Sequence, residues 1–128
     1  MEQSKTIQFN DQIRERTLKM SVGVRNLLLT KKVPPIDRDN VNQLIRSASS
    51  TAANYRAATR GRSDQEFYSK ICIVVEEMDE THFWLEYFIR CGIVSTEESS
   101  LLTNEIEQLV RLFSTIKKKM KLKLEGKV

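Results

Sequence analysis

The sequence has few of the residues that build metal centres, tight turns and phosphate-binding loops. Its 128 residues include one His, two Cys, four Gly and two Pro. So few soft ligands argue against a zinc or haem site, and we expect neither a metal nor a cofactor. The scarcity of Gly and Pro argues against a β fold with many turns, and the scattered glycines form no Gly-rich phosphate loop.

Long apolar runs are also lacking. The longest, Ile71–Val75, has five residues, whereas a membrane-spanning helix needs about 20. Met1–Asn10 contains no apolar run of the kind found in signal peptides. Cys72 and Cys91 lie 19 residues apart on one predicted helix, and a separation of about 28 Å is too long for a disulfide. We therefore predict a cytoplasmic protein with reduced thiols and no membrane contact.

Apolar residues at helical spacing predict four helices. The first runs from about Asp11 to Leu29, with Asn10 as its N-cap, and ends before two consecutive prolines, which cannot continue a helix. The second runs to about Thr59 and is capped by Asp37 or Asp39. The expected apolar stripe of the first helix is Ile13, Leu18, Val22, Val24, Leu27 and Leu28.

Two capping boxes mark the starts of the third and fourth helices. In Ser63-Asp64-Gln65-Glu66 and Ser95-Thr96-Glu97-Glu98, the serine and the final glutamate can each satisfy a backbone amide of the other. The third helix extends to Cys91, and Gly92 follows it. Short loops between four helices predict an all-α fold. We expect a single domain over residues 1–128, an antiparallel up-and-down four-helix bundle with a basic C-terminal tail from about residue 117.

Charge is distributed in blocks along the chain. Residues 1–62 hold 12 Lys/Arg against 5 Asp/Glu, residues 63–116 hold 3 against 11, and residues 117–128 hold 6 against one. Blocks of opposite sign favour an anionic partner for the basic parts, or self-association between unlike surfaces.

Arginines follow one side of the second predicted helix. Arg38, Arg46, Arg56 and Arg60 fall within a sector of about 80°, and Arg62 comes next in the loop. The planar guanidinium group suits bidentate contacts with phosphate. Two interpretations stay open: contact with nucleic-acid phosphates, or pairing with the acidic third helix across subunits. The predicted nucleic-acid contacts are Arg46, Arg56, Arg60 and Arg62, with Lys117, Lys118, Lys119 and Lys121 of the tail.

The third predicted helix is hydrophobic on more than one side. Phe83 and Tyr87 lie nearly opposite its core stripe, and Trp84 lies about 100° from that stripe. Either these aromatics lean over the bundle edge, or they form a subunit interface. Glu76 and Glu80 are i,i+4 neighbours, but a di-metal bundle also needs Glu-x-x-His motifs, which the chain lacks. We assign both glutamates to a solvated or interface-pairing acidic face.

No arrangement typical of catalysis is present in the sequence. A Ser or Cys nucleophile needs a base, usually a His held by a carboxylate. The single His, His82, lies on a helix beside aromatic residues, where packing is the commoner role. We predict no catalytic residues and no enzymatic activity.

Several segments together resemble one protein family. They are residues 47–58 with Asn54-Tyr55-Arg56-Ala57, the loop Arg60-Gly61-Arg62-Ser63, the acidic run at residues 76–80, and Phe83-Trp84-Leu85-Glu86. These resemble bacterial four-helix bundle proteins encoded by intervening sequences of 23S ribosomal RNA genes, the S23-type proteins. The likeness is sharpest over residues 43–94. Arg56 and Ala57 depart from the pattern, because many members have an acidic residue and a glycine there.

The resemblance implies a homopentameric ring of antiparallel bundles. In a related branch, such a protein is an accessory to the reverse transcriptase of diversity-generating retroelements and binds nucleic acid through a basic surface. We therefore predict a non-enzymatic, ribosome-associated bacterial protein that forms a homo-oligomer and binds RNA or DNA phosphates. The alternative is a protein-interaction scaffold or accessory subunit without direct nucleic-acid contact.

Overall fold

The computed structural model describes residues 2–127, which form four long helices and no β-strand. They are α1 (Glu2–Leu29), α2 (Arg38–Thr59), α3 (Asp64–Arg90) and α4 (Thr96–Leu124), and a short 3-10 helix, η1 (Pro35–Asp37), precedes α2. The predicted all-α class with four helices is confirmed for this part of the chain. None of these helices combines the length and apolar character that a membrane crossing requires.

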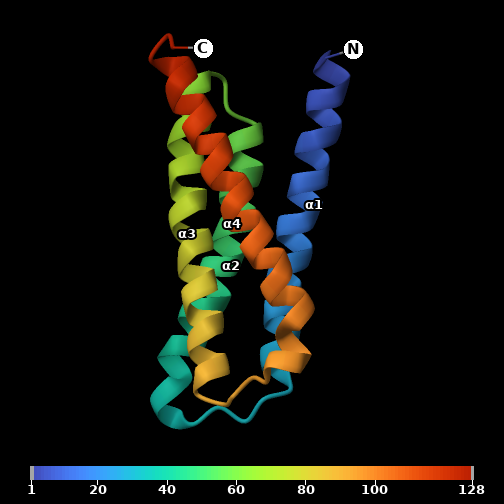
Figure 1. The fold of residues 1–128 in the computed structure, drawn as a ribbon, viewed down its shortest axis with the longest axis vertical. Helices are drawn as coiled ribbons and strands as arrows, with labels where there is room; N and C mark the ends of the chain where they lie inside the picture. Colours follow the sequence, from blue (N-terminus) through green and yellow to red (C-terminus); the bar gives the residue numbers. More distant parts are fainter. Residues whose placement is uncertain (1, 128) are drawn as a thin grey trace.

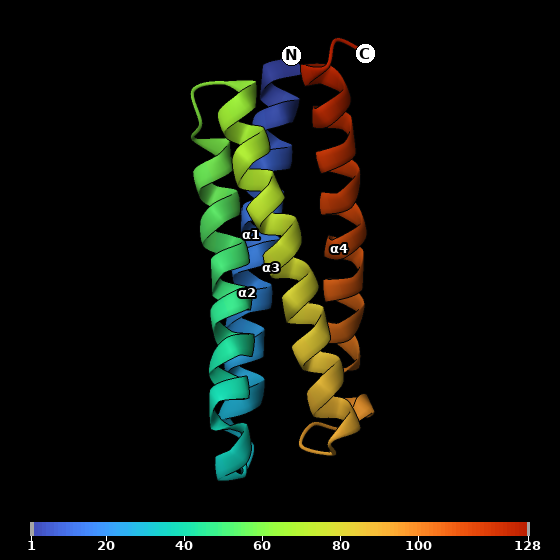
Figure 2. The same cartoon turned by 90° about the vertical axis from the view of Figure 1, so that its left-hand side faces the viewer.

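Each helix runs in the opposite direction to the one before it (Figure 1). α1 contacts α2 and α4, and α3 also contacts α2 and α4; the turned view shows α2, α3 and α4 side by side (Figure 2). Both chain termini and the α2–α3 loop consequently lie together at one end. We call this the terminal end, made of residues 2–14, 54–72 and 113–127. The other residues, 15–53 and 73–112, are called the body.

The core is a continuous column of apolar side chains between the four helices. Tyr55, Phe88 and Phe113 are its largest fully buried members. Two buried hydroxyls lie within it, where Thr81 Oγ1 donates to Ser47 Oγ over 2.9 Å and joins α3 to α2. Each of these hydroxyls also lies within hydrogen-bond distance of a carbonyl of its own helix, so neither is left without a hydrogen-bond partner.

The first helix differs from its prediction at its start and in its core stripe. α1 begins at Glu2 because no Gly or Pro interrupts residues 2–9, so Asn10 is not an N-cap. Leu18 and Val22 were expected in the core but are 55% and 47% exposed, and Met20 is buried instead. The cause is the angular position of these residues around the helix axis. Residues 13, 20, 24 and 28 share one helix face, and positions 18 and 22 fall on the opposite face.

The two predicted serine caps are present, one of them with a shift. The Ser95 box is complete, because Ser95 N donates to Glu98 Oε2 over 2.7 Å and Glu98 N donates to Ser95 Oγ over 3.1 Å. Ser63 Oγ accepts from Glu66 N, but the Glu66 carboxylate accepts from the Arg62 amide rather than from that of Ser63.

The other helix ends also lie close to their predicted positions. Gly92 adopts the left-handed conformation, with φ of 78°, just beyond the end of α3 at Arg90. Asp37 precedes α2 but makes no side-chain capping bond. Its Oδ1 instead accepts from Asn40 Nδ2 and from Tyr87 Oη, at 3.1 and 3.2 Å.

Candidate nucleic-acid interface

The fold gathers basic residues at the terminal end. The segments that form this end hold 12 Lys/Arg against 5 Asp/Glu, whereas the body holds 9 against 12. Contacts between distant segments hold this end together: the rings of Tyr55 and Phe113 lie 5.4 Å apart, and Lys123 Nζ lies 3.1 Å from Asp64 Oδ2. Arg56 of α2, Arg60 just after it and the lysines of α4 therefore lie at the same end of the molecule.

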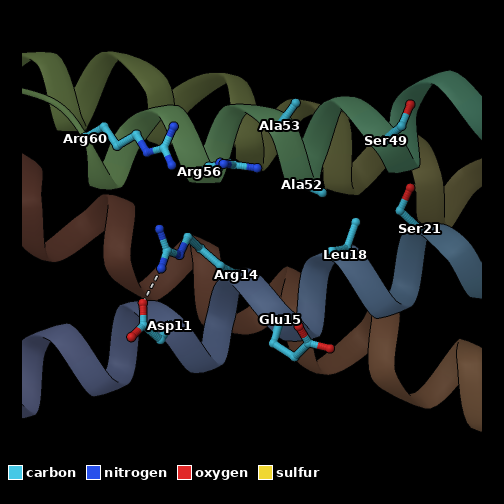
Figure 3. A pocket seen from close by; sticks show the side chains of 10 residues that line it. All are labelled: Asp11, Arg14, Glu15, Leu18, Ser21, Ser49, Ala52, Ala53, Arg56 and Arg60. Atoms are coloured by element: carbon cyan, nitrogen blue, oxygen red, sulfur yellow. Dashed lines mark hydrogen bonds and ion pairs between the residues drawn. The ribbon is translucent and has the colours of Figure 1, made fainter.

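A groove of about 720 Å³ lies between α1 and α2 and extends from this end into the body (Figure 3). Arg14 from α1, Arg56 from α2 and Arg60, which directly follows α2, extend toward the same space. Arg56 and Arg60 are exposed, and within residues 2–127 neither lies within ion-pair distance of a carboxylate. Guanidinium groups suit bidentate contacts with anions, and the carboxylates of Asp11 and Glu15 line the same groove.

Arg14 was missed by the sequence analysis. It lies on α1, 42 residues before Arg56, and only the packing of α1 against α2 brings the two together. The Asp11 carboxylate, one turn earlier on the same helix, accepts a hydrogen bond from the Arg14 guanidinium. Asp11 thus orients Arg14 at the edge of the groove.

Tyr55 helps to fix the two helices that form the groove. It is fully buried, and its Oη donates to Asn10 Oδ1 of α1 over 3.2 Å. Burial raises the pKa of Tyr55 to about 12, although the positive charge of Arg14 acts in the opposite direction. The tyrosine therefore stays protonated and can donate this bond at all pH values below about 12.

Beyond the arginines the groove is less polar. Leu18 of α1 and Ala52 and Ala53 of α2 line it, together with the hydroxyls of Ser21 and Ser49. The alanine side chains are single methyl groups, so they leave the space between the helices open. The groove thus has a cationic part and a largely apolar part (Figure 3).

Arg46 was predicted to join this basic surface but does not line the groove. It lies near Glu77 of α3, inside the same subunit. Burial and the negative charge of Glu80 raise the pKa of Glu77, and the charge of Arg46 partly opposes them. The charge of Arg46 is therefore close enough to act on Glu77, although no ion pair joins the two side chains among the described residues.

The remaining predicted basic residues are at the terminal end. Arg62 lies with Arg60 and Lys70 along a second groove, of about 430 Å³, beside the α2–α3 loop. The lysines of the predicted tail belong to α4, which continues to Leu124. Lys117 is half-buried, and the other three, Lys118, Lys119 and Lys121, are exposed.

The aromatic residues of α3 form a cluster on the outside of the bundle. Trp84 and Tyr87 are half-buried: Trp84 Nε1 donates to Glu80 Oε1 over 3.4 Å, and Tyr87 Oη donates to Asp37. Phe83 packs edge-on against Trp84, with ring centres 4.9 Å apart, and remains 54% exposed. Trp84 and Tyr87 thus lie along the bundle. Of these three aromatic residues, Phe83 has the largest exposed fraction and could contact a partner. Glu76 is exposed on the same helix.

No other feature of the described chain has the composition of a reactive centre. Among residues 2–127, no three His, Cys, Asp or Glu side chains are grouped so as to hold a metal ion. His82 is half-buried in a shallow groove with Glu86 and Glu107.

Comparison with known proteins agrees with the resemblance drawn from the sequence. Residues 10–115 match the family described as 23S rRNA-intervening sequence proteins. A crystal structure of a protein of unknown function from the S23 ribosomal protein family of Bacteroides thetaiotaomicron is similar in fold. Its TM-score is 0.72 and its identity 25%, over 85% of this chain and 97% of that one. No curated protein matches. Since the family match covers most of the chain and all three groove arginines, the chain belongs to the family of 23S rRNA-intervening sequence proteins.

Proposed function

We propose that this chain is a non-enzymatic, cytoplasmic protein that binds RNA or DNA phosphates as a homopentameric ring of antiparallel four-helix bundles. The observation that carries the proposal is the convergence of Arg14, Arg56 and Arg60 on one groove at the basic terminal end. The tail lysines and Arg62 extend the same positive surface.

Phosphate binding follows from the lack of internal partners. Within residues 2–127, Arg56, Arg60 and Arg62 form no ion pair, so their charges are available to an external anion. A nucleic acid that meets such a surface releases its condensed counterions, and this release drives association. Phosphates carry no base information, so binding is expected to show little sequence preference.

Assembly into a ring is supported by two different exposed apolar patches. A ring forms when one patch of each subunit contacts a different patch of the next. Phe83 of α3 offers one patch. Val22 of α1 and Leu101 of α4, 47% and 85% exposed, offer the other, beside a groove of about 740 Å³ between these helices. Cyclic symmetry would point every terminal end toward the same rim and so concentrate the positive charge there.

The test compares two triple variants with equal loss of charge. The first replaces Arg56, Arg60 and Arg62 with Gln. The second, a control, replaces the exposed body residues Arg25, Lys32 and Arg38 with Gln. Binding to a short RNA is measured over a salt series, with the mass of the assembly followed by light scattering.

We expect the first variant to flatten the slope of log affinity against log salt by just under one unit for each phosphate that it no longer neutralises. The control should flatten it less. An intact ring with an unchanged slope in the first variant would contradict the proposal, as would absence of RNA binding by the native protein at low salt.

A protein-interaction scaffold is the second candidate, because Phe83 is exposed on a helix that also presents Glu76. In that case the arginines pair with acidic α3 surfaces of neighbouring subunits. Dissociation of the ring in the Arg56, Arg60 and Arg62 variant, with the subunits still helical, would favour this candidate.

A further inference from the structure

We propose that the groove between α1 and α2 holds one nucleotide of a single-stranded nucleic acid. Its phosphate would lie on Arg14, Arg56 and Arg60, and its nucleoside along the apolar part of the groove. The inference rests on the proposed function and adds the strandedness of the ligand and the place of its base.

The cationic part of the groove has the features of a phosphate site. Arg14 is held by Asp11 on one helix, and Arg56 and Arg60 approach from the other (Figure 3). Each guanidinium presents several N–H donors in a fixed plane, which suits the oxygens of a phosphate. Arg14 is already paired with Asp11, but Arg56 and Arg60 have no carboxylate partner among the described residues, so a bound phosphate would compensate their charges.

The groove is too large for a phosphate alone. Its volume of about 720 Å³ lies in the range of about 300–1,000 Å³ that is typical of sites for organic ligands. The part away from the arginines is lined by Leu18, Ala52 and Ala53, which suit the face of a base or sugar.

Polar groups along this part can orient a nucleoside. The hydroxyl of Ser49 donates to the carbonyls of residues 45 and 46, so its oxygen remains free to accept from a ligand N–H or O–H. The exposed carboxylate of Glu15 also lines the groove. It repels a second phosphate and can accept a hydrogen bond from a sugar hydroxyl. The phosphate therefore belongs at the arginine end.

The arrangement selects single strands. In a duplex the base is paired and stacked inside the helix, so only the backbone would reach the arginines. A base that lies in the groove has to be unpaired. Within residues 2–127 no aromatic side chain lines the groove, so the contact is apolar and depends little on which base is present.

The decisive variant fills the groove without changing its charge. Ala53→Leu adds bulk at an exposed position of the groove, and Asn42→Leu introduces the same side chain at an exposed position of α2 outside it. Four probes are used: a short single-stranded RNA, the duplex of the same sequence, an abasic strand of the same length, and free AMP as a competitor. Circular dichroism and light scattering check the fold and assembly of each variant.

We expect the native protein to bind the single strand more tightly than the duplex or the abasic strand. Ala53→Leu should weaken single-strand binding by about fivefold to tenfold, as expected when the apolar burial of one base is lost. Duplex and abasic binding should not change, and Asn42→Leu should alter none of the three. AMP should compete poorly, because it lacks the neighbouring phosphates that the tail lysines contact.

Other outcomes separate this inference from the proposed function. Equal binding of strand and duplex, or no effect of Ala53→Leu, would overturn the inference and leave phosphate binding intact. If AMP competed as strongly as a single strand, the ligand of the groove would be a free nucleotide and the inference would be overturned. If no probe bound at low salt, both proposals would fail. Should Ala53→Leu disturb the assembly, Leu18→Gln at an exposed position is expected to give the same selective loss.

Discussion

The terminal end and the body of the bundle consist of the same four helices but use their charges differently. In the body, ion pairs join neighbouring parts of the fold: Arg16 Nε donates to Glu105 Oε2 over 3.0 Å, and the Lys31 ammonium pairs with Glu98. At the terminal end, Arg56 and Arg60 have no such carboxylate partner among the described residues. Arg16 and Lys31 in the body therefore connect segments of the fold. At the terminal end Lys123 also connects two helices, through Asp64, but Arg56 and Arg60 remain available to an external anion.

The largest expected effect tests whether the two regions differ only in charge. Phe113 at the terminal end and Phe88 in the body are both fully buried. We expect Phe113→Ala and Phe88→Ala each to lower the free energy of unfolding by about 3–5 kcal/mol, through reduced burial and the cavity left behind. Urea unfolding of both variants provides the measurement. A loss below about 1 kcal/mol for Phe113 alone would show that the terminal end is loosely packed.

The next effect concerns the contact between α1 and α2 beside the groove. Tyr55→Phe removes the hydrogen bond to Asn10, and we expect it to cost about 0.5–1.5 kcal/mol. The raised pKa of Tyr55, about 12 against an ordinary value of 10.0, means that the unfolded chain loses this proton first. Stability should therefore decline as pH rises from about 10 toward 12.

The Phe variant isolates the tyrosine contribution to this decline. Its stability should fall less steeply than that of the native protein over the same pH range, since it has no proton to lose at position 55. Identical alkaline profiles of the two proteins would exclude Tyr55 as the cause.

A smaller effect is expected at Glu98 in the body. The hydrogen bond from Lys31 and the bond from the Ser95 amide lower the pKa of Glu98. Its contribution to stability is thus present above the ordinary carboxyl pKa of 4.5 and is lost as pH falls through the lowered value. Glu98→Gln should lower the Tm at neutral pH, by less than Tyr55→Phe, and the difference from the native protein should shrink in acid. A difference that persists at low pH would mean that packing rather than charge is responsible.

The smallest expected effect is a gain in stability rather than a loss. Burial, with the charge of Glu80, raises the pKa of Glu77 despite Arg46, and Glu77 Oε2 has no hydrogen-bond partner. The folded protein therefore binds this proton more readily than the unfolded chain, and stability rises as pH falls toward the raised pKa. Glu77→Gln should stabilise the subunit at neutral pH by no more than about 0.5 kcal/mol. A clear loss of stability would mean that Arg46 depends on this carboxylate.

Local features of the fold were predictable from the sequence because nearby residues determine them. The Ser95 box and the left-handed Gly92 involve only their neighbours in the chain. The core stripe of α1 was harder, since α1 carries a second apolar set, including Leu18 and Val22, on its opposite side. Periodicity identifies both sets as helical, but only the packing of the other helices decides which one is buried.

The same limit applies to the candidate site. Arg56 and Arg60 were found because they share one side of one helix, but Arg14 belongs to a different helix, and its part in the groove depends on tertiary packing. The position of Arg46 near Glu77 likewise depends on how α3 packs against α2. The pattern of a single helix therefore predicted the arginines on the α2 side of the groove. The same pattern could not show that Arg46 lies outside the groove.

The central claim, that the terminal end and the groove that extends from it form the surface that contacts nucleic acid, can be tested by mapping the contact directly. Single-stranded RNA that contains 4-thiouridine is photocrosslinked to the native protein, and the attached peptides are identified by mass spectrometry. The account predicts crosslinks within residues 5–21, 49–70 and 117–127, the segments that carry the groove and the tail lysines. Crosslinks confined to residues 25–46 or 76–107 would contradict it.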